Sequence, residues 1–461
     1  MSKLSINISD LFNLSDAELF DPHLISDYQH ITIDSRLVKQ DSLFIAIKGN
    51  KFDGHKFINE AVNNGATAVV IEKRKLKKYD NLKVPIIAVK DTTTALGEIA
   101  SIWRSKLNAK VICITGSSGK TTTKDILVSL LKSKYKVAGT LLNNNNHIGV
   151  PLTLLSAKSD DDFIVIEAGT NHFGEIDYTT KIVSPDYSII TNIGASHLEF
   201  LKSKSGVLRE KEFLFKNTKK NGKVFINSDD PLLTKLKSKY SNNITYGFSE
   251  NCDIKGKIID TLFDGRCKLS VQSSRYNFEA ILPLYGIQNA KNILAASAIA
   301  ISVGLNKKSL IDVIQLLKAQ KQRLNVLHLK NKILIDDTYN ANPESMKASI
   351  ELVGNIAKHG RKILVLGDMF ELGEKSEVLH RLLSTVIKRN KISEVLLIGT
   401  KMKQLFEELQ SKGIDSKYFG TRKSLGNYLK KANFDDCTVL IKGSRGMKME
   451  EFVKIVNERF V

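Results

Sequence analysis

The chain has 461 residues, of which 42% are apolar and 26% are charged, and this balance excludes a disordered or fibrous protein. A chain of this length exceeds one ordinary hydrophobic core, so we expect several domains. The net charge of +20 would suit a nucleic acid, a membrane surface or an anionic substrate. The sequence has no basic arm and no basic stripe interleaved with aromatic residues, so we expect solvated lysine surfaces and no nucleic-acid partner.

The sequence carries no signal for a membrane span or for export. Its longest near-apolar run, 293–305, has 13 residues, which is too short to cross a bilayer and predicts a buried helix. The N-terminus lacks the basic and hydrophobic segments of a secretory signal. The four cysteines are scattered without a CxxC pair, which favours a reducing compartment without disulfides or structural zinc. We therefore expect a cytoplasmic protein.

Short β-branched runs alternate with helical stretches along the chain, which predicts α/β units around mostly parallel sheets. In the N-terminal part, 42–49 and 66–73 are predicted strands, and 55–65 between them is a predicted helix. The strands expected further along are 110–116, 162–169, 186–194 and 222–230, followed by 332–337, 362–368, 394–399 and 437–443. The last four are typical of a doubly wound sheet, whose ligand crevice lies at the carboxyl ends of the strands.

Residues 114–125 read ITGSSGKTTTKD and predict a phosphate-binding loop, although a strict Walker A pattern would have glycine at position 114. A buried strand precedes the loop and a helix follows it, which favours this interpretation over a chance turn. Gly116 and Gly119 allow successive amides to point into one concavity at the helix N-terminus. Lys120 can reach terminal phosphate oxygens, and the Thr121 hydroxyl is a suitable Mg²⁺ ligand. The predicted nucleotide contacts in this loop are Thr115, Gly116, Ser117, Ser118, Gly119, Lys120, Thr121 and Thr122.

These elements predict three α/β domains. The first spans 1–84, the second is a central P-loop ATPase-like domain with a parallel sheet over 85–320, and the third is a Rossmann-like domain over 321–461. A phosphate loop alone does not distinguish a kinase, an ATPase, a GTPase or a ligase, so the residues after the other strands have to decide.

Polar residues follow the strands that come after the loop. Glu167 ends one strand, where its carboxylate could hold Mg²⁺ directly or through water. Asn192 and His197 follow the next strand, and Lys211 lies further along the chain. Taken singly, each also has a structural explanation as a capping asparagine, a surface histidine or a solvated lysine.

Several motifs, in this order, resemble the Mur ligases of bacterial cell-wall synthesis. In the central part they are TGSSGKTTTKD, NNNNHIGVPLTLL, IEAGTNHFGEI and TNIGASHLEF, and in the C-terminal part they are DDTYNANPESM (336–346), LGDMFELG (366–373) and KGSRGMKME (442–450). Within that family, the chain is most similar to the members that add D-alanyl-D-alanine to UDP-N-acetylmuramoyl-tripeptide in peptidoglycan precursor synthesis. The motifs do not distinguish lysine from diaminopimelate as the third residue of the peptide.

The resemblance implies an ATP-dependent, amide-forming and ADP-forming ligase that uses Mg²⁺. The γ-phosphate of ATP would pass to the peptide carboxylate to give an acyl phosphate, which the amine of D-alanyl-D-alanine would then attack. Such a reaction needs screening of phosphate–carboxylate repulsion and alignment of three substrates, but no protein nucleophile. We expect the enzyme to act as a monomer.

The resemblance also assigns catalytic and metal-binding residues. Lys120 matches the phosphate-loop lysine, and Thr121, Glu167 and His197 match residues near two magnesium ions. Lys211 matches a lysine that these ligases carbamylate, which would turn an ammonium into an oxygen donor. Because the glutamate expected two places after this lysine is absent, the nearby lysines at 204 and 216 stay open as alternatives.

On the ATP side, the resemblance assigns Asn289 and Asn292 to the purine, and their spacing places them on one helix face. Arg323 would meet the ATP phosphates, while Asp337 and Asn340 would approach the ribose and phosphates. For Asp337, a turn carboxylate at a strand end is the structural alternative.

Other residues are assigned to the remaining substrates. Ser35, Arg36 and Lys48 of the first domain would bind the UDP moiety, and Asn145 and Asn146 the peptide end. An ordinary loop with a surface ion pair, or a plain turn, would explain these residues as well.

In the third domain, Lys442, Ser444 and Arg445 would lie near the incoming D-alanyl-D-alanine, whose carboxylate suits Lys and Arg.

Two other functions stay open. One is a different amide-forming ligase, such as another Mur ligase or folylpolyglutamate synthase, and the other is a P-loop kinase or a nucleic-acid-binding ATPase.

Overall fold

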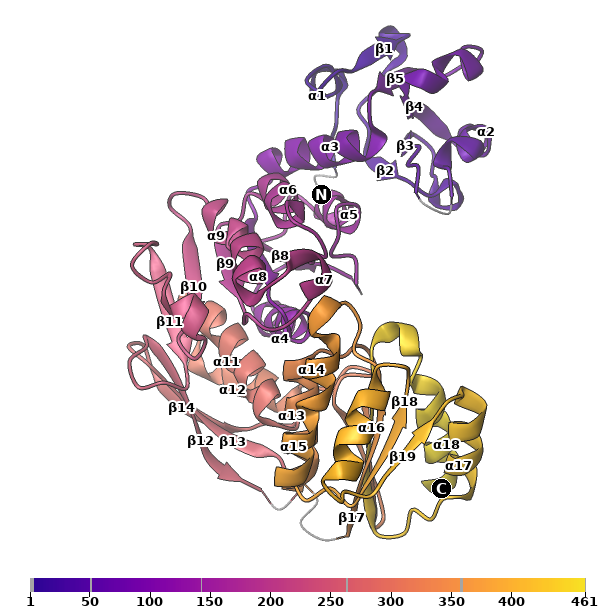
Figure 1. Ribbon diagram of the computed structural model, residues 1–461. Helices are drawn as coiled ribbons and strands as arrows, with labels where there is room; N and C mark the ends of the chain where they lie inside the picture. The colour runs from indigo at the N-terminus through magenta and orange to yellow at the C-terminus, as the bar shows by residue number, and fades with distance from the viewer. Residues whose placement is uncertain (1–3, 50–51, 142, 263, 357–359, 461) are drawn as a thin grey trace.

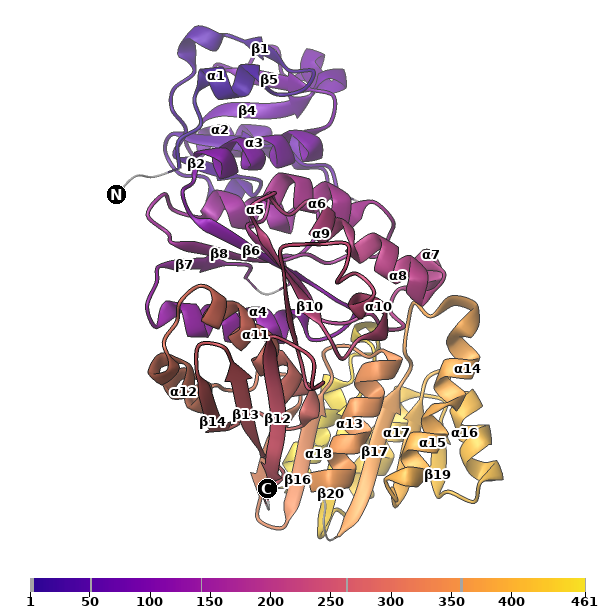
Figure 2. The ribbon, with the colours of Figure 1, turned by 90° about the vertical axis from the view of Figure 1, so that its left-hand side faces the viewer.

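The computed structural model describes residues 4–49, 52–141, 143–262, 264–356 and 360–460. These residues form three domains, each built on its own β-sheet, which follow one another along the length of the molecule (Figure 1). The central domain lies between the other two (Figure 2). The predicted class, three α/β domains, is confirmed.

A five-stranded sheet with the strand order β1-β5-β4-β3-β2 forms the N-terminal domain. Strands β2 to β5 are parallel, and β1 pairs with β5 in the antiparallel direction. The strands predicted at 42–49 and 66–73 are confirmed, and the predicted helix at 55–65 begins as a 3₁₀ turn that continues as α2. The elements are α1 Ile8–Phe12, β1 Glu18–Phe20, β2 His30–Thr32, β3 Ser42–Ile45, α2 Ile58–Asn63, β4 Ala66–Glu72 and β5 Ile86–Val89.

Helix α3 (Thr92–Lys106) joins the N-terminal domain to the central domain. It packs on α5 (Gly149–Ser156) and α6 (Glu175–Val183), which cover one face of the central sheet. Buried apolar residues of both domains belong to one continuous cluster, which runs from Leu4 to Leu236. The two domains therefore share a hydrophobic core.

A buried ion pair lies at this joint. The Arg104 guanidinium of α3 is 5% exposed and donates a hydrogen bond of 2.8 Å to the Asp186 carboxylate. Its other hydrogen bonds go to backbone carbonyl oxygens, among them those of Val183 at 3.0 Å and Ser184 at 3.2 Å. Full pairing of this kind offsets the cost of removing a charge from water.

The central domain has a nine-stranded sheet with the order β14-β13-β12-β11-β10-β9-β6-β8-β7. The neighbouring strands β12, β11, β10, β9, β6, β8 and β7 all run parallel to one another, which confirms the predicted parallel sheet. The strands are β6 Lys110–Thr115, β7 Val137–Gly139, β8 Phe163–Glu167, β9 Tyr187–Ile190, β10 Lys223–Asn227, β11 Asn243–Gly247, β12 Ile254–Thr261, β13 Cys267–Ser273 and β14 Asn277–Ile281. The sequence analysis did not identify the antiparallel extension β12–β13–β14.

The helices of the central domain cover both faces of its sheet. The predicted apolar helix is confirmed as α11, which is buried along almost its whole length and packs against α4, the helix after the phosphate loop. The remaining helices are short or lie at the edge of the domain. The bounds are α4 Lys120–Lys132, α7 Leu198–Leu201, α8 Lys204–Lys211, α9 Phe213–Lys216, α10 Pro231–Thr234, α11 Ile287–Ser302 and α12 Lys307–Leu316.

The C-terminal domain has a six-stranded sheet with the order β15-β16-β20-β17-β18-β19. All four predicted strands are confirmed, as β16, β17, β18 and β20, and only β15 is antiparallel. One hydrophobic cluster lies on each face of the sheet, which is the doubly wound arrangement. The elements are β15 Asn325–Leu329, β16 Lys332–Asp337, α13 Pro343–Ile356, β17 Arg361–Gly367, α14 Ser376–Arg381, α15 Leu383–Arg389, β18 Glu394–Ile398, α16 Met402–Ser411, β19 Ser416–Phe419, α17 Arg422–Lys431, β20 Cys437–Lys442 and α18 Glu450–Phe460.

The limits of the three domains stay predictions. The last strand of the first sheet, β5, lies beyond residue 84, and a loop after α12 leads into the C-terminal sheet near residue 321. Within the described ranges, every helix is too short or too polar to span a lipid bilayer.

The Arg104–Asp186 pair predicts a stability effect. We expect Arg104→Met to lower the free energy of unfolding by about 3 kcal/mol, because several buried carbonyl oxygens lose their donor and Asp186 keeps only the Val111 amide and two partly exposed lysines. Urea unfolding can be followed by the fluorescence of Trp103, the single tryptophan, which is buried on the same helix. The control Lys106→Met removes a partly exposed pair with Asp10 and should cost about 1 kcal/mol or less. Equal unfolding midpoints for the two variants would contradict this account.

Candidate active site

Two glycines give the phosphate loop between β6 and α4 its curl. Gly116 has a φ of 152° and Gly119 a φ of 79°, a backbone region that other residues rarely adopt. A Cβ atom on Gly116 would lie 1.9 Å from Oγ1 of Thr191, and one on Gly119 would lie 2.3 Å from Oδ1 of Asn292. Both positions therefore require glycine, as the loop motif predicts.

Asn192, at the end of β9, holds the loop from behind. Its backbone carbonyl accepts a hydrogen bond of 3.0 Å from the amide of Ser117, and its side-chain oxygen accepts one of 3.0 Å from the amide of Ser118. Its side-chain amide donates to the Ser118 hydroxyl at 3.0 Å. The sequence placed Asn192 only at a strand end, and its spatial relation to the loop, 74 residues earlier, carries no sequence signal.

The loop faces a cavity of about 300 Å³ between the central and C-terminal domains. The cavity brings together most of the residues predicted for catalysis and ATP binding. Its lining includes Ser117, Ser118, Gly119, Lys120, Thr121, Thr122, Asn145, Glu167, His197, Asn289, Asn292, Arg323, Asp337, Asn340 and Lys442. The predicted residues that lie outside this lining are Ser35, Arg36, Lys48, Thr115, Gly116, Asn146, Lys211, Ser444 and Arg445. The Thr115 hydroxyl is buried and donates to the carbonyl oxygen of Ala168 at 2.7 Å.

Lys120 begins helix α4 and points back over the loop. Its ammonium donates a hydrogen bond of 2.8 Å to the carbonyl oxygen of Gly116. Withdrawal from bulk water lowers the pKa of Lys120, the charge of Glu167 opposes this shift, and the charge of Arg323 adds to it. Arg323 donates to the Thr121 hydroxyl at 3.1 Å, so two cations from different domains flank the loop.

Glu167, at the end of β8, is the carboxylate best placed to hold a cation. It is 1% exposed, and its Oε1 accepts a hydrogen bond of 2.7 Å from the Asn145 side-chain amide. Its Oε2 is buried without a hydrogen-bond partner among the described residues. A carboxylate oxygen left free in this way, near a threonine hydroxyl, fits a hard divalent cation such as Mg²⁺. The described residues contain no cluster of three or more His, Cys, Asp or Glu at metal-binding distance, so the protein donors are few.

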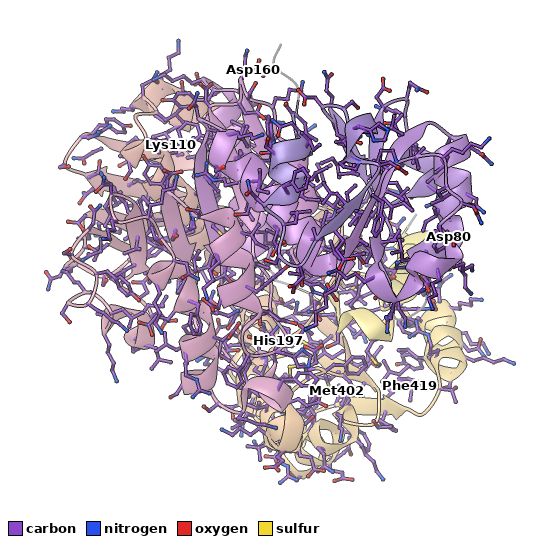
Figure 3. All side chains as sticks on the ribbon, turned by 90° about the horizontal axis from the view of Figure 1, so that it is seen from above. Asp80, Lys110, Asp160, His197, Met402 and Phe419 are labelled. Carbon is purple, nitrogen blue, oxygen red and sulfur yellow. The ribbon has the colours of Figure 1, made fainter. Side chains whose placement is uncertain are left out.

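His197 precedes α7 and lies where the central and C-terminal domains meet (Figure 3). Its Nδ1 lies 2.5 Å from Oε2 of Glu371, a residue of the C-terminal domain. Burial lowers the pKa of His197, the hydrogen bond to Glu371 opposes this shift, and the charges of Lys120 and Lys211 add to it. The same hydrogen bond lowers the pKa of the Glu371 carboxyl. Glu371 lies in the motif 366–373, but no sequence pattern predicts that this residue is part of the site.

Lys211 is 1% exposed at the end of α8. Burial, reinforced by the charge of Lys120, lowers its pKa well below the ordinary value for lysine. Among the described residues, its amine has no hydrogen-bond or ion-pair partner. Its amine therefore differs from those of the neighbouring lysines at 204 and 216, which are ion-paired near the surface.

The C-terminal domain contributes a buried polar cluster. The Lys442 ammonium lies 2.5 Å from Oδ2 of Asp337 and donates to the carbonyl oxygen of Asn340 at 2.9 Å. Asp337 also accepts from the Ser349 hydroxyl at 2.7 Å. The Arg323 guanidinium lies 3.8 Å from the centre of the Tyr339 ring. Lys442 is thus fully paired, which holds the ends of β16 and β20 together at the cavity.

Ser444 and Arg445 follow β20. Ser444 is buried, and its hydroxyl accepts a hydrogen bond of 2.8 Å from the amide of Phe370. Arg445 is 58% exposed and donates to Gln322 at 3.1 Å. These contacts fix the loop beside the cavity, and the predicted contacts of both residues with D-alanyl-D-alanine stay predictions.

Helix α11 places Asn289 and Asn292 next to the phosphate loop. Asn289 donates to the carbonyl oxygen of Tyr285 at 2.9 Å, and the Asn292 side chain lies against Gly119. Both side chains line the cavity, as their spacing on one helix face predicts, and their contact with a purine stays a prediction.

The remaining predicted residues lie further from the phosphate loop. In the first domain, the Ser35 hydroxyl donates to Glu60 at 3.1 Å, Arg36 pairs with Asp34 at 2.6 Å, and Lys48 is exposed. The Asn146 side chain accepts a hydrogen bond of 2.8 Å from the amide at the start of α5. These contacts are those of an ordinary surface ion pair in the first domain and of a turn at Asn146. The roles of these residues in binding UDP and the peptide stay predictions.

A glycine-curled phosphate loop, two flanking cations and a cavity closed by a Rossmann-like domain define a three-domain, nucleotide-dependent enzyme. Three family models match the chain in order: the Mur ligase family, catalytic domain over 27–104, the Mur ligase middle domain over 114–300, and the Mur ligase, glutamate ligase domain over 322–445. The chain belongs to the Mur ligase family.

Full-length relatives support this conclusion. The UDP-N-acetylmuramoyl-tripeptide–D-alanyl-D-alanine ligase of Buchnera aphidicola subsp. Baizongia pistaciae is 37% identical over 98% of both chains, and the Escherichia coli ligase of the same name is 33% identical over 99% of both. The structure is similar to MurF from Acinetobacter baumannii, with a TM-score of 0.89, 28% identity and coverage of 99% and 100%. It is also similar to MurF ligase from Thermotoga maritima in complex with ADP, with a TM-score of 0.82, 29% identity and coverage of 94% and 97%.

The fit of Gly119 predicts a binding defect. In Gly119→Ala the new Cβ would displace Asn292 and strain the loop, so we expect ATP affinity, measured by calorimetry, to fall by about tenfold or more. Gly174→Ala is a matched control, because Gly174 also precedes a helix with a positive φ, of 89°, but has open space around it. Similar losses in both variants would mean that general strain, and not the packing of the loop, causes the effect.

Proposed function

We propose that the chain joins D-alanyl-D-alanine to UDP-N-acetylmuramoyl-tripeptide with hydrolysis of ATP to ADP and phosphate, as a step of peptidoglycan precursor synthesis. The observation that carries the proposal is the single cavity that holds the phosphate loop, the free Glu167 oxygen and the paired Lys442. Similarity to ligases of this name over nearly the whole chain supports the choice of substrates.

The chemistry has two steps. A carboxylate oxygen of the peptide attacks the γ-phosphorus, the bond to ADP breaks, and an acyl phosphate forms. The dipeptide amine then attacks the acyl carbon, the C–N bond forms, phosphate leaves, and the amine loses a proton. Both steps bring anions together, so preorganised donors have the largest effect on the rate. Lys120, Arg323 and the amides at the start of α4 are such donors, and the C-terminal domain forms the other wall of the cavity.

Mg²⁺ fits the donors on the central domain. Glu167, with the Thr121 hydroxyl and His197, would hold the ion, which supplies charge neutralisation for the phosphates when bound. Glu167 is supported by its free buried oxygen, and Thr121 by its place beside Lys120 in the loop. Asn145 orients the Glu167 carboxylate through its 2.7 Å hydrogen bond and lies at the mouth of the cavity, where it would also meet the peptide.

Lys211 is proposed to be carbamylated. Its neutral amine attacks carbon dioxide, an N–C bond forms, and a proton is released, which leaves a carbamate anion. The unpaired amine and its lowered pKa favour this addition, because only the neutral form reacts. The negative carbamate would attract the Lys120 ammonium and would offer oxygen atoms to the magnesium site.

The other assignments complete the proposal. Asn289 and Asn292 would contact the purine, and Asp337 and Asn340 the ribose and phosphates. The UDP moiety would lie over the first domain, near Ser35, Arg36 and Lys48, and Asn146 would support the peptide end through the loop it caps. Ser444 and Arg445 would border the D-alanyl-D-alanine site. Since ATP and UDP-linked precursors are cytoplasmic metabolites, we place the enzyme in the cytoplasm, where one chain supplies all the residues named and a monomer suffices.

A phosphate-release assay tests the function. Purified protein with ATP and Mg²⁺ would receive UDP-N-acetylmuramoyl-tripeptide together with D-alanyl-D-alanine, D-alanine, L-alanine or L-glutamate. We expect phosphate release and a pentapeptide mass only with the dipeptide. Release with a single amino acid would indicate a different ligase of the superfamily. Release that needs polynucleotide and weakens steeply with salt would indicate a nucleic-acid-dependent ATPase instead.

The carbamate predicts a spectroscopic signal. With ¹³C-labelled bicarbonate, we expect the wild-type protein to show a carbamate resonance in ¹³C NMR and the Lys211→Arg variant to lose both this resonance and nearly all turnover. Lys216→Arg is the matched control, because Lys216 lies close in sequence but is exposed, and it should keep both. A resonance that survives in Lys211→Arg and disappears in Lys216→Arg would assign the modification to the other lysine.

A further inference from the structure

Glu371 and His197 meet across a domain boundary. His197 lies at the start of α7 in the central domain, and Glu371 follows β17 in the C-terminal domain, 174 residues away in sequence. The Nδ1–Oε2 distance of 2.5 Å places the two side chains in direct hydrogen-bonding contact. The contact is therefore one of the points at which the third domain touches the proposed magnesium site.

The backbone on both sides is shaped for this contact. His197 has a φ of 54° and Glu371 a φ of 62°, and neither is a glycine, so both conformations are strained. The backbone amide of Glu199 donates to the carbonyl oxygen of Glu371 at 3.1 Å, so the two loops are also joined through their main chains. The main-chain hydrogen bond joins the two loops independently of their side chains, which argues against a casual surface contact.

A second contact between the same domains fixes the segment just before His197. The Glu344 carboxylate of α13 accepts hydrogen bonds of 2.9 and 3.0 Å from the amide of Ala195 and pairs with Lys204 at 2.8 Å. The C-terminal domain thus holds this segment at three points, which are the Ala195 amide, the His197 imidazole and the Glu199 amide.

The hydrogen bond determines which ring nitrogen is free. An ionised carboxylate can only accept hydrogen bonds, so Nδ1 of His197 carries the proton and donates it to Glu371. The lone pair of the neutral ring is then on Nε2, and His197 lines the cavity that also holds Glu167. A histidine whose second nitrogen is held by a carboxylate is the usual arrangement for a metal ligand.

We propose that Glu371 is a positioning residue, which fixes the tautomer and the orientation of His197, so that docking of the C-terminal domain completes the magnesium site of the central domain. The inference rests on the proposed function, because it takes His197 as a ligand of that site. It assigns the C-terminal domain a role in metal binding besides its contact with substrates. Neither Glu371 nor any other residue of that domain then has to touch the ion.

Metal binding and histidine spectra test this assignment together. Mn²⁺ affinity in the presence of ADP would be measured by electron paramagnetic resonance, and ¹⁵N spectra of histidine-labelled protein would report the tautomers. His197→Asn identifies the His197 signals among those of the nine histidines. The variants are Glu371→Leu, Glu371→Gln, and the matched control Glu374→Leu, which removes an exposed carboxylate three residues away that has no ion pair among the described residues.

We expect Glu371→Leu to lose the Nδ1-protonated form of His197 and to bind Mn²⁺ about 10- to 100-fold more weakly. Glu371→Gln keeps the size of the side chain, and its amide can accept or donate, so mixed tautomers and an intermediate affinity should result. Glu374→Leu should match the wild type in both measurements. Thermal unfolding of each variant confirms that it is folded, and Glu371→Gln keeps the test decisive should the leucine variant unfold.

Three results would overturn the inference. They are an unchanged Mn²⁺ affinity in both Glu371 variants, a weakened affinity with the wild-type His197 tautomer, and an equal loss of affinity in Glu374→Leu. Wild-type protein that binds no Mn²⁺ would remove the proposed magnesium site and this inference with it. Wild-type binding that the Glu371 variants leave unchanged would overturn the inference alone, so the two failures are distinguishable.

Discussion

The site depends on the curl of the phosphate loop, because this curl brings the start of α4 and the Lys120 side chain to the cavity. The loop is not self-supporting. Thr191 and Asn292 fill the space that the two glycines leave open, and Asn192 hydrogen-bonds the serines between them. These supports come from the end of β9 and from α11, so a buried apolar helix also anchors a polar loop. Since the donors are fixed before an anion arrives, they need little reorganisation when charge develops.

Three lysines near the cavity show how burial decides what an amine does. Lys442 is neutralised by Asp337 and holds two strand ends together. Lys120 lines the cavity and donates to a carbonyl oxygen of the loop. Lys211 has no partner among the described residues, and its pKa falls well below that of the exposed lysines that give the chain its net charge. The same residue type therefore serves in structure, in electrostatics and as a nucleophile.

Patterns that are local in sequence were the ones that could be predicted. The parallel strands, α11 and the phosphate loop follow from apolar runs and from glycine spacing, and the strand-end rule brought Glu167 and His197 to one cavity. Strands β12 to β14 were missed because their burial alternates along a half-exposed edge of the sheet. Glu371 and the role of Asn192 depend on contacts between distant segments, which no local pattern encodes.

The continuous core around α3 has a mechanical consequence. The N-terminal and central domains share one hydrophobic cluster, whereas the C-terminal domain has clusters of its own on the two faces of its sheet. The first two domains therefore cannot separate without exposing apolar surface to water, whereas displacement of the C-terminal domain would leave the buried residues of their shared cluster covered.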